Sequence, residues 1–109
     1  MLIKITEKAR KLYGTFCPYS TEKCSSFSEL DYKIQRCIDL GKEMTVTHNN
    51  VHLIQYYHLQ FHVLHNQIIN LVRTDYCYHI PEILKIKHYY NTYKVVAILH
   101  KAWHLDVED

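Results

Sequence analysis

The stretch that decides the fold is residues 47–73, which read THNNVHLIQYYHLQFHVLHNQIINLVR. It contains neither glycine nor proline, and Ile54, Phe61 and Ile68 are spaced by sevens within it. This spacing is typical of a helix packed along its length, and Thr45 or Thr47 can cap its start. We therefore predict one long helix over residues 47–73. Its core-facing stripe is Leu53, Ile54, Tyr57, Phe61, Leu64, Ile68, Leu71 and Val72.

Two shorter helices are expected before it. The first covers Thr6 to Tyr13 and stops at Gly14, with an apolar stripe of Ile5, Ala9 and Leu12. Residues 15–25 hold Pro18 with clustered Ser and Thr, so we expect a loop there. The second helix begins near Ser26 or Ser28 in a capping-box pattern and ends near Gly41. Its stripe is Leu30, Ile34, Cys37 and Ile38.

A fourth helix is expected after the connector at residues 74–80. Pro81 fits the first turn of a helix, which then runs to about Leu105. The β-branched and aromatic content leaves a strand open as an alternative for residues 93–99. Two glycines and two prolines in 109 residues also favour helices over an all-β fold. The predicted fold is therefore all-α: a single domain over residues 1–109, built as a compact bundle of about four helices with a long antiparallel C-terminal helical hairpin.

Composition narrows the classes of function. The net charge of +2 and an acidic tail argue against broad binding to phosphate backbones. We find no signal-peptide pattern and no apolar run long enough to span a membrane, so no membrane partner is expected. Four cysteines without a CxxC pair indicate free thiols in the cytoplasm, with a Cys17–Cys24 disulfide as the alternative. High Ile, Lys, Asn, Tyr and His suggest an AT-rich source such as a phage, a virus or an AT-rich bacterium.

Histidine spacing raises the question of a metal. Three HxxxH pairs occur, at His48–His52, His58–His62 and His100–His104. On a helix such pairs share a face, so His58, His62 and His65 could hold zinc with a further ligand. The competing interpretation is a solvated polar face opposite the apolar stripe, and we favour it because surface helices carry such faces. We therefore expect no cofactor, with zinc as the alternative.

Catalytic motifs are missing. In His58-Leu-Gln-Phe-His62, Leu59 stands where a metallopeptidase needs its glutamate base. Gly14 and Gly41 are the only glycines, which excludes glycine-rich phosphate loops. A cysteine nucleophile needs a base within hydrogen-bond reach; Cys77 and His79 are close in sequence, but their spacing does not define that geometry. We expect a protein that is not an enzyme.

Ten tyrosines and nine histidines in 109 residues suggest a surface that binds another protein. Tyr13, Tyr19, Tyr32, Tyr56, Tyr76 and Tyr78 are candidates for exposure. We predict a small adaptor, regulator or inhibitor with a macromolecular, preferably protein, partner; a homo-oligomer stays open. The predicted partner-binding residues are His48, His52, Tyr56, His62, Tyr76 and Tyr78. The nucleic-acid alternative uses a basic face of the last helix, at Lys87, Asn91, Lys94 and Lys101.

Overall fold

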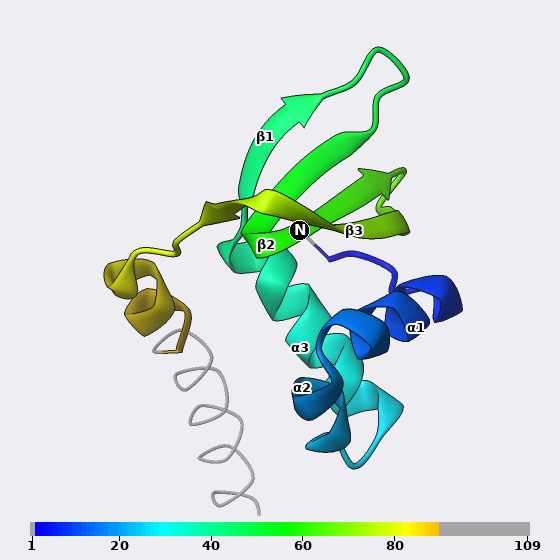
Figure 1. The fold of residues 1–109 in the computed structure, drawn as a ribbon, viewed down its shortest axis with the longest axis vertical. Helices are drawn as coiled ribbons and strands as arrows, with labels where there is room; N and C mark the ends of the chain where they lie inside the picture. The colour runs from blue at the N-terminus through cyan, green and yellow to red at the C-terminus, as the bar shows by residue number, and fades with distance from the viewer. Residues whose placement is uncertain (1, 90–109) are drawn as a thin grey trace, which may run out of the picture.

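The computed structural model describes residues 2–89 and shows helices packed on one face of a small antiparallel sheet (Figure 1). The elements in chain order are α1 (Glu7–Phe16), α2 (Pro18–Glu22), α3 (Phe27–Leu40), β1 (Lys42–Val46), β2 (His52–Leu64) and β3 (Gln67–Tyr78). Residues 82–89 are also helical. The strands lie in the order β1-β2-β3, and each pairs antiparallel with the next. The all-α prediction is therefore wrong: the chain combines α-helices with a β-sheet.

The two N-terminal helices are confirmed. Thr6 caps α1, its side chain accepting a hydrogen bond from the amide of Ala9, and Ser26 caps α3 in the same way. The stripe Leu30, Ile34, Cys37 and Ile38 is buried as predicted. Gly14 does not stop α1, which continues to Phe16, and the expected loop at residues 15–25 contains α2. Glycine destabilises a helix by only about 1 kcal/mol relative to alanine, so a helix can continue past a single glycine.

The predicted helix over residues 47–73 is wrong, because that stretch forms β2 and most of β3. The absence of glycine and proline concealed a turn. His65 and Asn66 connect the strands with φ angles of 50° and 60°, and two positive φ angles are what a tight type I′ hairpin turn requires. Asparagine enters this region more readily than most residues. Alternation was also present in the sequence: Leu59, Phe61 and Val63 are buried, while Gln60 and His62 between them face away.

A bulge explains why Ile54 and Phe61, seven residues apart on β2, both belong to the core. Ile54, Phe61 and Ile68 are all buried. In an uninterrupted strand, residues seven apart point to opposite faces. Tyr57 has a φ of 50°, and the β2–β3 register shifts between Tyr57 and Leu59, so the strand changes phase there. Ile54 before the bulge and Phe61 after it can then both face the helices.

Buried Gln55 stabilises the same irregularity. It is 1% exposed, and its Nε2 donates to the carbonyl of Tyr57 at 2.8 Å and to Thr74 Oγ1 at 2.8 Å. It also donates to the carbonyl of Tyr76 at 3.2 Å. These contacts hold the part of β3 that falls out of register with β2. Residues 74–78, expected as a connector between two helices, therefore belong to the sheet, and the predicted helical hairpin does not exist.

The helix after Pro81 is confirmed for residues 82–89. The rest of the predicted helix to Leu105, and the strand alternative for residues 93–99, lie outside the described residues. Within residues 2–89, no helix is long and apolar enough to cross a membrane.

Candidate functional site

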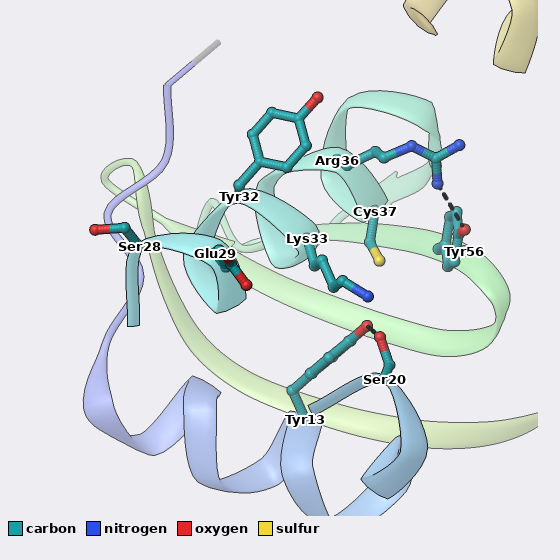
Figure 2. Close-up of a pocket in the computed structure, with 9 residues that line it drawn as sticks. All are labelled: Tyr13, Ser20, Ser28, Glu29, Tyr32, Lys33, Arg36, Cys37 and Tyr56. Atoms are coloured by element: carbon teal, nitrogen blue, oxygen red, sulfur yellow. Dashed lines mark hydrogen bonds between the residues drawn. The ribbon is translucent and has the colours of Figure 1, made fainter. Parts of the chain in front are cut away.

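A hollow of about 640 Å³ opens between α3, the helices α1 and α2, and the first half of β2 (Figure 2). It is concave and has both aromatic and charged walls. Its lining consists of Tyr13, Ser20, Ser28, Glu29, Tyr32, Lys33, Arg36, Cys37 and Tyr56. A volume of this size is in the range of pockets that hold small ligands or the side chains of a partner.

Helix α3 supplies the charged wall because of residue spacing. Lys33, Arg36 and Cys37 are separated by three and four residues, so they share one face of the helix. Leu30, Ile34 and Ile38 occupy the neighbouring face, which the sheet covers. Figure 2 shows the side chains of Lys33 and Cys37 pointing from α3 towards Tyr13 on α1. The apolar stripe thus fixes the rotation of the helix that presents the two cations to the hollow.

Hydroxyl groups line the opposite walls. Tyr13 Oη and Ser20 Oγ are hydrogen-bonded at 2.9 Å, which joins α1 to α2. Arg36 Nη1 donates to Tyr56 Oη at 3.5 Å, a long contact that joins α3 to β2. Burial is the main cause that raises the pKa of Tyr13 and of Tyr56. Both phenols are therefore protonated at neutral pH and can donate hydrogen bonds.

The thiol and the carboxylate of the hollow have little scope for chemistry. Cys37 is 4% exposed, and burial raises its pKa to about 12, so the nucleophilic thiolate does not form near neutral pH. The carboxylate of Glu29 accepts hydrogen bonds from the amide and hydroxyl of Ser25, each at 2.9 Å. The Ser25 amide, followed by its hydroxyl, lowers the pKa of Glu29. The hollow consequently combines two cations with protonated donors, an arrangement suited to an anionic group.

The predicted partner-binding residues are dispersed over the molecule. Tyr56 lines the hollow, whereas His48 lies in the exposed loop between β1 and β2. His52 at the start of β2 pairs with Glu43 on β1. His62 is half-buried beside Gln60, its Nε2 lying 2.9 Å from Gln60 Oε1. Tyr76 and Tyr78 lie at the far end of β3. Of these six residues, only Tyr56 lines the hollow.

The predicted metal site loses its geometric basis. His58 and His62 are four residues apart on a strand, where that separation spans about 13 Å instead of one helical turn. His58 Nδ1 lies 3.0 Å from the carbonyl of Thr74, and His65 is exposed in the hairpin turn. Among the described residues, no group of three or more His, Cys, Asp or Glu side chains is placed to hold a metal ion.

The predicted nucleic-acid face can be followed only at its first residue. Lys87 is exposed on the helix at residues 82–89. Asn91, Lys94 and Lys101 lie outside the described residues.

Sequence reasoning missed most of the hollow. Tyr13 was expected to be exposed, but it is 5% exposed and forms one wall. Of the other tyrosines expected at the surface, Tyr19, Tyr32 and Tyr76 are exposed, and Tyr56 and Tyr78 are half-buried. Lys33 and Arg36 were not singled out at all. Their spacing beside the apolar stripe was a usable signal, but one of the walls facing them, at Tyr56, comes from β2, which was expected to be a helix.

Compared with known proteins, the chain matches no protein-family model, no curated protein and no solved structure.

Proposed function

We propose that this chain is a non-enzymatic binding protein that holds an anionic side chain of a protein partner in the hollow between α1, α2, α3 and β2. The observation that carries this proposal is the convergence of Lys33 and Arg36 with the protonated hydroxyls of Tyr13 and Tyr56 on one recess. Cations and hydroxyl donors together form charge-assisted hydrogen bonds with carboxylate or phosphate oxygens. The high pKa of Cys37 argues against a nucleophilic role for the thiol.

The charge balance favours a single anionic group over a nucleic-acid strand. Lys33 and Arg36 are offset in part by Glu29 in the same lining, and the whole chain carries only +2. A nucleic-acid backbone would need a longer basic track. Tyrosine and arginine are also the residue types that carry most of the affinity in protein interfaces. The free thiols of Cys17, Cys24, Cys37 and Cys77 fit a reducing compartment such as the cytoplasm.

The test is an array of short peptides with random flanks around a fixed central phosphotyrosine, phosphoserine, glutamate or glutamine. We expect the purified chain to prefer the anionic centres over glutamine. Binding of the best peptide should weaken at least tenfold in Arg36→Gln and in Lys33→Gln. The matched control is Lys42→Gln, because Lys42 is an exposed lysine on β1 outside the lining of the hollow.

Three outcomes would overturn the proposal. One is equal binding to anionic and glutamine-centred peptides. Another is an affinity that Arg36→Gln and Lys33→Gln leave unchanged. The third is tighter binding to single-stranded oligonucleotides than to any peptide, which would assign the chain to the nucleic-acid-binding class.

A further inference from the structure

The helix at residues 82–89 turns its polar side towards the rest of the protein. Lys85 Nζ lies 5.3 Å from the centre of the Tyr57 ring, a cation–π contact with β2. His88 Nε2 lies 3.6 Å from Asp39 Oδ2 on α3. The side chains of Lys85 and His88 are only 29% and 20% exposed. The face that a surface helix normally gives to water is here the face that contacts the domain.

The opposite side of this helix is apolar and exposed. Ile83 is 57% exposed and Ile86 is 59% exposed, and Tyr89 next to Ile86 on the helix surface is 71% exposed. Figure 1 shows this helix at the edge of the molecule, away from α1 and α2. Large apolar side chains that gather on one exposed face mark a surface that another element covers.

The sequence beyond residue 89 repeats the spacing of Ile83 and Ile86. Ile83, Ile86, Tyr90 and Tyr93 follow one another at intervals of three, four and three residues. These are the intervals of the a and d positions of a coiled-coil heptad. Lys85 and His88 then fall at the c and f positions, on the outside of such a pair, in agreement with their contacts to the domain.

Charge complementarity identifies a second copy of the chain as the occupant. With Ile83 at an a position, Glu82 is at the preceding g position and Lys87 at the following e position. In a parallel two-stranded pair, g of one helix lies beside e of its partner in the next heptad. Glu82 of each copy would then meet Lys87 of the other, twice by symmetry. Glu82 accepts a hydrogen bond from Lys85 of its own helix at 3.1 Å, but it is 79% exposed, and Lys87 is also exposed, so a second copy can reach both.

We propose that two copies of this chain associate in parallel through the exposed face of the helix at residues 82–89, with Ile83 and Ile86 at the centre of the contact. This interface is distinct from the hollow, so either proposal can fail without the other.

Sedimentation equilibrium of the full chain tests the proposal. We expect the wild type to be dimeric at micromolar concentration and the double variant Ile83→Glu/Ile86→Glu to be monomeric. Because both side chains are already exposed, the variant should fold like the wild type. At a concentration low enough for both to be monomeric, the two circular dichroism spectra should be the same. The matched control is Leu2→Glu, which places the same charge at an apolar residue that is 86% exposed elsewhere, and it should remain dimeric.

A charge exchange tests the pairing and the parallel orientation. Lys87→Glu should weaken dimerisation several-fold by placing two acidic residues together, and Glu82→Lys/Lys87→Glu should restore it. A wild type that is monomeric at 100 µM would overturn the proposal. An Ile83→Glu/Ile86→Glu variant that remains dimeric would overturn it as well. If the exchange variant does not recover, the parallel g-to-e pairing is refuted.

Discussion

Two glycines provide a matched test of the tertiary structure, because the same substitution has opposite consequences at each. A Cβ added at Gly41 would lie 2.7 Å from Ile54 Cγ2, 2.9 Å from the carbonyl oxygen of Cys37 and 3.0 Å from that of Gln55. Unstrained carbon contacts are about 3.5–4.0 Å. Two of the three atoms are backbone, so no change of rotamer can relieve them.

The expected changes in the free energy of unfolding follow from these distances. Overpacking costs about 1–3 kcal/mol, and the rigid neighbours place Gly41→Ala near the upper end of that range. Alanine also restricts the unfolded chain, which stabilises the folded state by up to about 1 kcal/mol. The expected net loss of stability is therefore about 2 kcal/mol. At Gly14 in α1, the nearest atoms of Thr21 are 3.8 Å away, an ordinary contact. Gly14→Ala should therefore stabilise the protein by about 0.5–1 kcal/mol, the usual difference in a helix.

Urea denaturation followed by far-ultraviolet circular dichroism measures both changes. The midpoint should fall for Gly41→Ala and rise for Gly14→Ala with similar slopes, since neither substitution changes the surface exposed on unfolding. In thermal melts the two variants should differ by about 10 °C or more, at about 4–8 °C per kcal/mol. If Gly41→Ala is as stable as the wild type, β2 does not approach the end of α3. Gly41 would then lie in an open linker, as in the helical bundle that the sequence suggested.

Three further measurements examine the core and the titrating groups. Phe61→Ala should cost about 3–5 kcal/mol, because this ring is fully buried on β2, and an unchanged urea midpoint would contradict that position. Cys37 should resist iodoacetamide at pH 8 in the native protein and react in urea. Half-buried Cys77 should react faster than Cys37 in the native protein, and mass spectrometry of the labelled peptides distinguishes the two. Burial lowers the pKa of His62 below 6.5, so the stability that its neutral form contributes is present above pH 6.5 and is lost as the pH falls below it. The urea midpoint of His62→Gln should therefore decrease less than that of the wild type between pH 7 and pH 5; equal decreases would refute the assignment.

Only part of the candidate site could be predicted from the sequence. The face of α3 that carries Lys33 and Arg36 follows from the periodicity of that helix. Tyr56 was singled out from the sequence, but for a surface on a long helix. Its position opposite Arg36 depends on β2 passing beside α3, a contact between residues 20 positions apart in the chain. No local pattern specifies that contact.

The sequence by itself determined the helices whose signals are local. The cap at Ser26 and the stripes of α1 and α3 are interactions between residues three or four positions apart, which propensity and spacing capture directly.

Only the tertiary structure decided the state of residues 47–73. Their apolar residues fit a helical period, and equally they fit two strands that change phase at Tyr57 and turn at His65 and Asn66. What distinguishes the two is pairing between strands and the burial of Gln55 against β3, which become favourable only once the strands meet. Strand formation is governed more by context than helix formation is, and here context outweighed the local period.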